Sequence, residues 1–367
     1  MAYLLLSLIA LSCLGAGLAL LLEVADSYLG FYGECHIDIN SGEKKVTVQG
    51  GGSLLSTLME QGIFIPSACG GRGSCGYCKV KVHGGGGPLL PTETPWLGPE
   101  EIEARVRISC QVKVRGDMMI EIPPELFLIR EFRSRVEGLR NLTHEIKELG
   151  LRLIEPDAIT FKPGQYVQFQ VPEYEGCPES VYRAYSIASA AHESGNITLI
   201  VTRVPGGLAT TYIHEVLKAG DEVAFNGPYG DFYLRDSDRE IFLVATGSGL
   251  APIMSILYQI AEERISRKTT LVFGARQRTD LFYLEEIEAL KGKISGLEAI
   301  FTLSRPGEED QWEGERGRVT DVLEKIIKEG ANKEAYLCGN PAMVESCVEL
   351  LKRKGIPEEL IFYDKFA

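Results

Sequence analysis

The sequence predicts a multidomain protein with an N-terminal transmembrane helix, a small α+β domain, an antiparallel β-barrel domain and an α/β domain. Three observations lead to this prediction. Residues 1–22 contain no charged side chain, short β-type runs separated by Gly, Pro and Asp fill the middle of the chain, and strands alternate with helices from Glu240 onwards. Such alternation is typical of a parallel sheet that is covered by helices.

Composition limits what the chain can be. It has 367 residues, 45% of them hydrophobic, which is enough for two or three domains with packed cores and excludes disorder as the main state. The formal net charge of −13 leaves no excess of Lys and Arg for a phosphate backbone, so we expect no nucleic-acid partner. Nine Cys in a chain of this length are too dilute for a disulfide scaffold.

The N-terminal segment is predicted to anchor the chain in a membrane. As a helix, residues 1–22 would span about 33 Å, which matches a hydrocarbon core of about 30 Å. We therefore predict a transmembrane anchor over 1–24. A cleaved secretory signal is the alternative, but such a signal opens with Lys or Arg, and the first basic residue here is Lys44. A second uncharged segment, 241–260, has the pattern of a strand, a Gly-rich turn and a helix. We therefore expect it inside an α/β domain and not as a second membrane span.

The positions of Gly and Pro between predicted elements divide the remaining chain into three predicted domains, 33–125, 126–238 and 239–367. In the first, HIDIN and KKVTVQG form a hairpin around Ser41-Gly42, and Ser53 caps a short helix. Further strands are predicted at KVKVH and QVKVRGDMMIEI, and the glycine run 84–87 is predicted to be a loop. The second domain has short strands and one helix at TTYIHEVL, which indicates a small antiparallel barrel.

Four cysteines have the spacing of an iron–sulfur site. Cys69, Cys75 and Cys78 lie in SACGGRGSCGYC, and Cys110 follows about thirty residues later. Four thiolates are what a [2Fe-2S] cluster needs, and the glycines let the loop wrap closely around the inorganic sulfides. Zinc remains an alternative, although four-Cys zinc sites usually contain two C-x2-C pairs and this chain has one. The other cysteines and the five histidines match no ligand or catalytic spacing.

An ordered set of motifs follows in the second and third predicted domains. It comprises Arg183-Ala-Tyr185-Ser186 on a predicted strand, GLATT at 207–211, GPYGDF at 227–232, TGSGLAP at 246–252 and CGNP at 338–341. This set resembles the ferredoxin-NADP reductase superfamily from about residue 126 to the C-terminus. The resemblance implies a FAD-binding β-barrel followed by a Rossmann-like NAD-binding domain.

Together with the anchor and the cysteine loop, the chain is similar over essentially its full length to the F-subunit (NqrF) family of Na+-translocating NADH:quinone reductases. The matching pieces include ISCQVKV, RAYS, LKAGDEV, GARQRTDLFYLEEI, LCGNP and the terminal YDKFA. The segment before RAYS and the loop before Gly207 are shorter than expected for that family. The resemblance implies a β-grasp ferredoxin-like domain for residues 33–125.

The resemblance also implies roles for residues around FAD. Arg183 would neutralise a flavin phosphate, Tyr185 would pack on the isoalloxazine, and Ser186 would hydrogen-bond the ring near N5. Gly207 and Thr210, with Thr211 beside them, would contact the pyrophosphate; a simple helix cap is the alternative for Thr210. Ser186, Tyr185, Cys338 and Phe366 would be the residues nearest the hydride transfer.

The predicted NADH site lies in the last domain. Gly247 and Gly249 let the backbone approach a diphosphate at the start of a helix that contains Pro252. By resemblance, Cys338 and Gly339 would lie beside the nicotinamide, and Phe366 would cover the flavin; for Cys338 a small buried core residue is the alternative. Recognition of a 2′-phosphate needs Arg or Lys at the adenosine end, and the candidates are Arg276, Arg278 and Arg305. NADH is favoured because GARQRTDLFYLEE resembles the NADH-using family.

The function that this reading implies is that of a membrane-anchored electron-input subunit. NADH would reduce FAD, the electrons would pass to the [2Fe-2S] cluster and then to membrane subunits of a quinone-reducing complex. The N-terminal helix would contact lipid in the cell inner membrane as a single pass, with the globular domains in the cytoplasm. The alternatives are a stand-alone anchored reductase that serves an oxygenase or another acceptor, and an anchored ferredoxin-like carrier without reductase activity.

Overall fold

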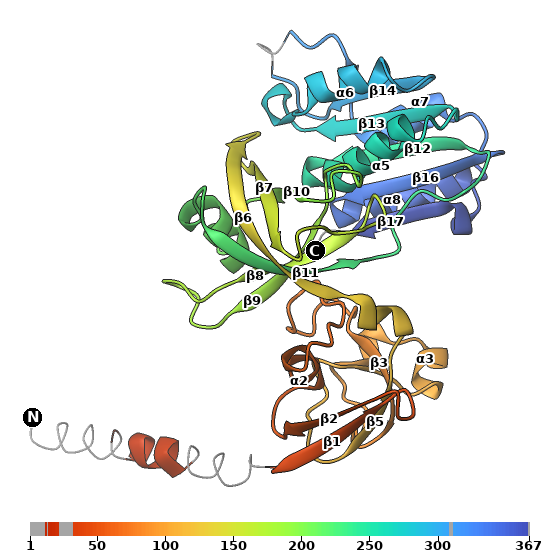
Figure 1. Ribbon diagram of the computed structural model, residues 1–367. Helices are drawn as coiled ribbons and strands as arrows, with labels where there is room; N and C mark the ends of the chain where they lie inside the picture. The colour runs from red at the N-terminus through yellow and green to blue at the C-terminus, as the bar shows by residue number, and fades with distance from the viewer. Residues whose placement is uncertain (1–11, 13, 22–31, 308–310, 366–367) are drawn as a thin grey trace, which may run out of the picture. The chain divides into compact units, whose positions relative to one another are not determined.

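The computed structural model describes residues 12, 14–21, 32–307 and 311–365 (Figure 1). The chain divides into two compact units, Met1–Leu128 and Ile129–Ala367. Residues 12 and 14–21 are helical, and the rest of the predicted anchor over 1–24 lies outside the described residues. Within the described ranges, no helix is both long and apolar enough to cross a membrane. The finer division of the second unit near residue 239 stays a prediction.

The first unit is built on a five-stranded mixed sheet in the order β2-β1-β5-β3-β4. Two α-helices, α2 and the short α3, and 3-10 turns accompany this sheet among the described residues. The elements are β1 (Glu34–Ile39), β2 (Lys44–Gln49), α2 (Leu54–Glu60), β3 (Lys79–Gly84), η1 (Thr94–Trp96), α3 (Pro99–Glu103), β4 (Val106–Ile108), β5 (Met118–Glu121) and η2 (Pro124–Leu128).

The predicted hairpin and capped helix of this unit are confirmed. Strands β1 and β2 pair antiparallel around a turn at Asn40 and Ser41, and alternate residues of β1 are buried because successive side chains point to opposite faces. The Ser53 Oγ accepts a hydrogen bond of 3.1 Å from the Ser56 backbone N–H and so caps α2.

The strand predicted over residues 111–122 is shorter in the structure, where only Met118–Glu121 form β5. The preceding QVKV segment alternates apolar and polar residues, but its backbone groups are engaged elsewhere. The Leu54 N–H donates to the Val112 carbonyl at 2.7 Å, and the Val114 N–H donates to the Gly52 carbonyl at 3.0 Å. The segment therefore supports the start of α2 instead of extending the sheet.

A buried ion pair ties the glycine run to the sheet. The Arg107 guanidinium on β4 donates to both carboxylate oxygens of Glu93, at 2.9 and 2.6 Å, and to the backbone carbonyls of Gly86, Gly87 and Pro88. Burial alone would raise the pKa of Glu93, but the hydrogen bonds from Arg107, the Leu90 N–H and the Ile108 N–H outweigh it and hold the pKa below its usual value. The loop predicted over 84–87 is thus confirmed for residues 85–87, whereas Gly84 is the last residue of β3.

The second unit begins with a six-stranded antiparallel sheet that forms a half-barrel, in the order β10-β7-β6-β11-β8-β9. A bridge between Ile187 and Leu199 joins the segments at its two edges. The predicted helix at TTYIHEVL is confirmed as a short α-helix that continues as a π-helical turn. The elements are β6 (Arg130–Asn141), β7 (Ile146–Glu155), β8 (Tyr166–Val171), β9 (Val181–Ser186), β10 (Asn196–Thr202), α4 (Leu208–Thr211), η3 (Tyr212–Val216) and β11 (Glu222–Tyr229).

A parallel sheet in the order β15-β14-β13-β12-β16-β17 follows, and its strands lie side by side in Figure 1. The predicted alternation is confirmed, although the two-residue β15 was not expected. The elements are β12 (Glu240–Thr246), η4 (Gly247–Gly249), α5 (Leu250–Glu262), β13 (Thr269–Ala275), η5 (Arg278–Asp280), α6 (Leu284–Lys291), β14 (Leu297–Leu303), β15 (Glu315–Arg316), α7 (Val319–Ile326), β16 (Lys333–Gly339), α8 (Pro341–Arg353), η7 (Glu358–Leu360) and β17 (Ile361–Lys365).

Both faces of this sheet are covered. Ile241 and Leu243 of β12 pack in one core with α5 and α6, whereas Phe242 and Val244 pack in a second core with α7 and α8. The strand order reverses between β12 and β16, because the chain continues from β12 to β13 on one side and reaches β16 on the other. In sheets of this kind ligands bind outside the carboxyl ends of the strands at such a switch point.

Candidate functional site

The four predicted cluster cysteines lie in the first unit as two pairs. The Cys69 and Cys75 sulfurs are 3.3 Å apart, and the Cys78 thiol donates to Cys110. Each donated S–H stabilises the thiolate that accepts it, which lowers the pKa of Cys69 to about 4 and that of Cys110 to about 7. Two pairs of sulfurs match the chemistry of a two-iron cluster, in which each iron takes two thiolates.

The loop that carries these thiols is shaped by close contacts at glycines. Gly73 and Gly76 have φ of +75° and +69°, a region that favours glycine. A Cβ on Gly73 would lie 2.5 Å from the Gln111 Nε2, and one on Gly76 would lie 2.9 Å from Trp96. Neither Gln111 nor Trp96 is among the site residues that we predict from the sequence. The position of Gln111 directly after Cys110 was the available signal.

Gln111 also contacts a cluster ligand, since its Nε2 donates to the Cys110 Sγ at 3.6 Å. The donor set of two thiol pairs, with Cys69, Cys75 and Cys78 in the Gly-rich loop and Cys110 after β4, therefore fits a [2Fe-2S] cluster. Among the residues that the structure describes, no group of three or more His, Cys, Asp or Glu is close enough to hold a single metal ion.

The RAYS motif occupies β9, as expected for residues of a strand. The Ser186 Oγ is buried and has no hydrogen-bond partner among the described residues. Tyr185 packs against the half-barrel core and contacts Phe169, with ring centroids 6.3 Å apart; burial raises its pKa. The Arg183 Nη1 donates to the Tyr182 carbonyl at 2.6 Å. A strand that carries an unpartnered buried hydroxyl, an aromatic ring and a guanidinium within four residues fits the flavin that the motif predicts.

The predicted pyrophosphate residues lie at α4. Gly207 precedes the helix, and a Cβ there would meet the Thr210 Oγ1 at 2.7 Å. The Thr210 hydroxyl accepts from the Val204 N–H and lies within hydrogen-bond distance of the Val204 and Gly207 carbonyls. In this structure Thr210 therefore holds the loop together, and Thr211 at the end of α4 is more accessible.

The nucleotide motifs meet at the switch point of the parallel sheet. Gly249 lies so close to β16 that a Cβ would stand 2.3 Å from the Cys338 carbonyl, and a Cβ on Gly339 would stand 2.4 Å from the Thr246 Oγ1. Gly247, at φ +56°, has no atom near its Cβ position. Cys338 is fully buried, which raises its pKa, and Pro252 is buried in the first turn of α5. Phe366 lies outside the described residues.

Two further hydroxyls at this turn were not singled out in the sequence. The Thr246 Oγ1 is buried without a partner among the described residues. The Ser248 Oγ bonds the Thr202 Oγ1 at the end of β10 at 2.8 Å, and the Ser255 Oγ donates to the Ser189 carbonyl at 2.8 Å. These bonds connect the half-barrel with the parallel-sheet part of the second unit.

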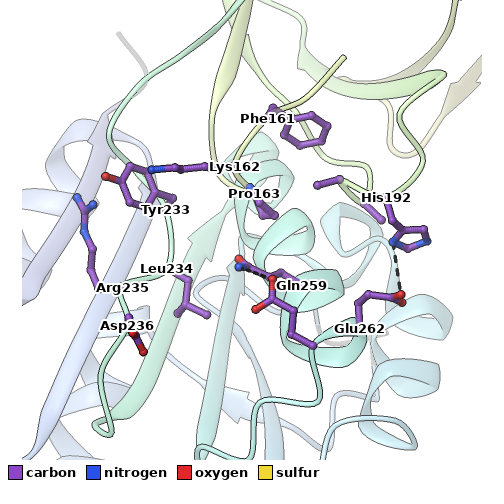
Figure 2. Close-up of a pocket in the computed structure, with 13 residues that line it drawn as sticks. Phe161, Lys162, Pro163, His192, Tyr233, Leu234, Arg235, Asp236, Gln259 and Glu262 are labelled. Atoms are coloured by element: carbon purple, nitrogen blue, oxygen red, sulfur yellow. Dashed lines mark hydrogen bonds and ion pairs between the residues drawn. The ribbon is translucent and has the colours of Figure 1, made fainter. Parts of the chain in front are cut away.

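A separate cavity of about 520 Å³ lies at the other end of α5. Figure 2 shows Lys162, Tyr233 and Arg235 on one side of it and His192 with Glu262 on the other. The Lys162 Nζ and the Arg235 guanidinium both stand over the Tyr233 ring. None of the residues predicted to bind a cofactor lines this cavity, so it is distinct from the candidate site.

Three family models match the chain in order. Residues 37–115 match the 2Fe-2S iron-sulfur cluster binding domain, 134–233 the oxidoreductase FAD-binding domain, and 243–349 the oxidoreductase NAD-binding domain. Among solved structures, the Amycolatopsis cytochrome P450 reductase GcoB has a TM-score of 0.73 at 28% identity, covering 90% of this chain and 98% of that one. A ferredoxin reductase in carbazole 1,9a-dioxygenase has a TM-score of 0.71 at 26% identity, covering 91% and 98%.

These matches, the paired thiols and the switch-point turn define an iron–sulfur flavoprotein oxidoreductase that uses a nicotinamide nucleotide. The sequence relatives are more specific. The NqrF subunit of the Na(+)-translocating NADH-quinone reductase of Neisseria meningitidis is 37% identical, covering 95% of this chain and 96% of the relative, and that of Idiomarina loihiensis is 36% identical with the same coverage. The chain belongs to this NqrF family.

Proposed function

We propose that this chain is the electron-input subunit of a Na+-translocating NADH:quinone reductase. It takes electrons from NADH through FAD and a [2Fe-2S] cluster and delivers them to the other subunits of the complex. The observation that carries this proposal is the presence of four paired thiols and a reductase unit in one chain of the NqrF family. The electron transfer requires the flavin of the reductase unit as well as the cluster. A nicotinamide gives two electrons as a hydride, whereas a cluster accepts one electron at a time.

The flavin, when bound, would convert the hydride into single electrons. The chain's own residues would prepare that step. Ser186 would use its unpaired hydroxyl at the ring edge, Tyr185 would pack on the ring, and Arg183 would hold a phosphate. Gly207 and Thr211 would lie along the pyrophosphate, with Thr210 holding the loop in place.

For NADH, the backbone of Gly247 and Gly249 would contact the diphosphate at the start of α5, where the helix dipole favours an anion. Pro252 suits the first helical turn, in which a backbone N–H is not needed. Cys338 and Gly339 at the end of β16 would set the position of the nicotinamide. No acid–base residue is required, because positioning carries most of a hydride transfer.

Cys69, Cys75, Cys78 and Cys110 would bind the cluster. Residues 1–24 would anchor the chain in the cell inner membrane, supported by the uncharged run from Met1 to Leu22. The globular units would then face the cytoplasm, where NADH is found. A Δ1–24 variant is expected in the soluble fraction, whereas the full chain should stay with membranes after an alkaline wash.

The test of the proposed function uses the purified full chain. NADH should bleach the flavin absorbance, and a low-temperature EPR signal of reduced iron should appear. In Cys75→Ala the bleaching should remain while the EPR signal is lost, and Cys347→Ala, which removes a buried cysteine outside the loop, should keep both. Zinc instead of iron in metal analysis would contradict the proposal. Co-purification with an oxygenase instead of membrane subunits would favour the stand-alone reductase, the alternative that the two similar reductase structures support.

A further inference from the structure

The half-barrel and the parallel-sheet part of the second unit carry different cofactor sites. Under the proposed function the flavin lies at Ser186 of the half-barrel, and the nucleotide lies at the turn after β12. A hydride is transferred only when donor and acceptor are almost in contact and correctly aligned. The contacts that orient one part against the other therefore affect the rate of transfer, although they touch neither cofactor.

The centre of the junction between these two parts is apolar. Ile146, Ala188 and Ile200 of the half-barrel pack in the same core as residues of α5 and α6. Burial of apolar surface holds two parts together but is not directional, so it fixes their orientation less well than hydrogen bonds do. At the nucleotide turn, the two serine bonds described above supply direction. A second directional contact, away from this turn, is needed to prevent rotation about it.

Four polar side chains provide such a second contact between the β6–β7 hairpin and the start of α6. They are Arg140, Glu148, Tyr283 and Glu286, and we call them the clasp. The Arg140 guanidinium donates to both carboxylate oxygens of Glu148, at 3.1 and 2.9 Å. The Tyr283 hydroxyl donates to the Glu148 Oε2, and the Arg140 Nη2 donates to the Glu286 Oε1 at 3.4 Å. Glu148 of the half-barrel is thus bonded directly to Tyr283 of the parallel-sheet part.

Tyr283 is fixed in both its backbone and its side chain. Its φ of +58° lies in the left-handed region, which bulky residues rarely adopt. Such a conformation persists only where the surrounding structure holds it. The side chain is only 9% exposed, and this burial raises its pKa, so the hydroxyl stays protonated and can donate to Glu148. The Arg140 guanidinium also lies over the ring, 5.6 Å from its centroid.

The clasp is continuous with the nucleotide side of the sheet. Tyr283 ends the segment that leaves the carboxyl end of β13, where parallel sheets of this kind bind ligands. In the same segment, the Asp280 Oδ1 lies 3.7 Å from the Nδ1 of His144 in the β6–β7 turn. Asp280, Tyr283 and Glu286 belong to the sequence piece DLFYLEE, to which the cofactor sites give no role. This piece connects the nucleotide edge of the sheet to the half-barrel.

We propose that Glu148 and Tyr283 are positioning residues for hydride transfer, because the clasp fixes the nucleotide site in the orientation in which the nicotinamide meets the flavin. The proposal rests on the proposed function, in which NADH gives up a hydride to the flavin and becomes NAD+. Neither residue contacts a cofactor. Loss of the clasp should therefore slow the hydride step without weakening the binding of NADH.

The test uses the full chain with FAD and follows flavin absorbance by stopped flow over a range of NADH concentrations. In Tyr283→Phe and in Glu148→Gln the rate at saturating NADH should fall about 10-fold, because a displacement of about 1 Å can cost up to about 100-fold. The apparent Kd for NADH should stay within about twofold. NADH deuterated at the transferred position should slow each variant at least as much as it slows the native chain, since the hydride step then limits the rate.

The double variant and a matched control show whether this bond is responsible. Tyr283→Phe with Glu148→Gln should be no slower than the slower single variant, because both changes remove the same bond. Glu222→Gln is the control, since Glu222 pairs with Arg135 at 3.0 Å inside the half-barrel and contacts no residue of the clasp. It should reduce the flavin at the native rate. An equal slowing in Glu222→Gln would overturn the proposal.

Hydrogen exchange in the flavin-free chain gives a measurement that does not depend on turnover. In Tyr283→Phe, segments 140–148 and 280–286 should both exchange faster, whereas helix α8 should not change. Should Tyr283→Phe fail to fold, Glu148→Gln, which keeps the shape of the side chain, decides the test.

Two results would show that the proposal is wrong. Variants that lose stability but reduce the flavin at the native saturating rate would leave the clasp a purely structural contact. A raised apparent Kd at an unchanged rate would mean that this region binds the nucleotide itself. A native chain whose flavin is not reduced by NADH would instead contradict the proposed function, so the two failures are distinguishable.

Discussion

Two buried hydroxyl groups in the motifs of the candidate site lack a hydrogen-bond partner among the described residues. Most buried polar groups form hydrogen bonds, and one that lacks a partner costs about 1–3 kcal/mol. The Ser186 Oγ and the Thr246 Oγ1 are buried without described partners, and they lie in the two motifs assigned to flavin and nucleotide. Ser255, which is equally buried, has its partner in the Ser189 carbonyl.

Ser186→Ala should therefore separate stability from function. In the flavin-free chain we expect the free energy of unfolding to stay constant or rise by about 1 kcal/mol, because an unpaired group is removed. Reduction of bound flavin by NADH, followed by stopped-flow absorbance, should slow by about 10- to 100-fold. Ser255→Ala is the control and should lose about 1 kcal/mol of stability. A Ser186→Ala variant that loses as much stability as Ser255→Ala would argue against an unpaired hydroxyl.

At the cluster, Gln111→Leu is expected to lower the reduction potential. The Gln111 Nε2 donates to the Cys110 sulfur, and such a bond stabilises the reduced, more negative cluster. Loss of a bond worth about 1 kcal/mol corresponds to about 40 mV for one electron. An EPR-monitored redox titration measures the shift. Gln61→Leu, a change at the exposed end of α2, should leave the potential unchanged.

The elements differ in how far the sequence predicts them. The parallel strands and their helices follow from long apolar runs with clear turns, and the Ser53 cap follows from one residue. The QVKV segment shows why other predictions of elements are wrong. Its alternation is typical of a strand, but its backbone groups form hydrogen bonds with those of Gly52 and Leu54. The two-residue β15 carries no pattern, and contacts such as Gln111 with Gly73 depend on residues far apart in the sequence.

At the same scale, the Glu93–Arg107 pair should control the stability of the first unit. Glu93→Gln leaves Arg107 buried without its anion, and such a loss costs about 3–5 kcal/mol. Urea unfolding of the first unit, followed by the visible absorbance of the cluster, should show this loss of unfolding free energy. Glu121→Gln, which alters an exposed pair with Lys81, should leave the unfolding midpoint unchanged.

The same pair gives a pH dependence. The folded pKa of Glu93 lies below its ordinary value of 4.5. Its contribution is therefore present above pH 4.5 and is lost as the pH falls through the folded pKa. Native chain should lose stability in this acid range, and Glu93→Gln should lose less. Equal acid sensitivity in both would assign the effect to other carboxylates.

For the whole molecule, electron transfer between the units is intramolecular. Residues 31–126 contain eleven acidic and nine basic side chains, so this part is nearly neutral although the chain is strongly acidic. A diffusing partner is often steered by charge, which makes its association depend on salt. A covalent connection replaces such steering with a fixed effective concentration.

We accordingly expect the rate from flavin to cluster in the full chain to change by less than about twofold between low and high salt. Laser-flash or stopped-flow absorbance of the two cofactors measures this rate. Transfer from the chain to a soluble one-electron acceptor of high charge serves as the positive control for salt sensitivity. A steep fall of the internal rate with salt would mean that charge guides the units together despite their connection.

The fixed conformation of the glycine run 84–87 and of Pro88 limits where this protein can be labelled. Four consecutive glycines would ordinarily be chosen for the insertion of an epitope tag or a fluorescent label, since such a stretch usually tolerates extra residues. Here three successive peptide carbonyls, from Gly86 to Pro88, are fastened to one guanidinium on the neighbouring strand. A label placed there would pull Arg107 from its carboxylate, so the glycine-rich stretch is among the poorest places in the first unit to attach one.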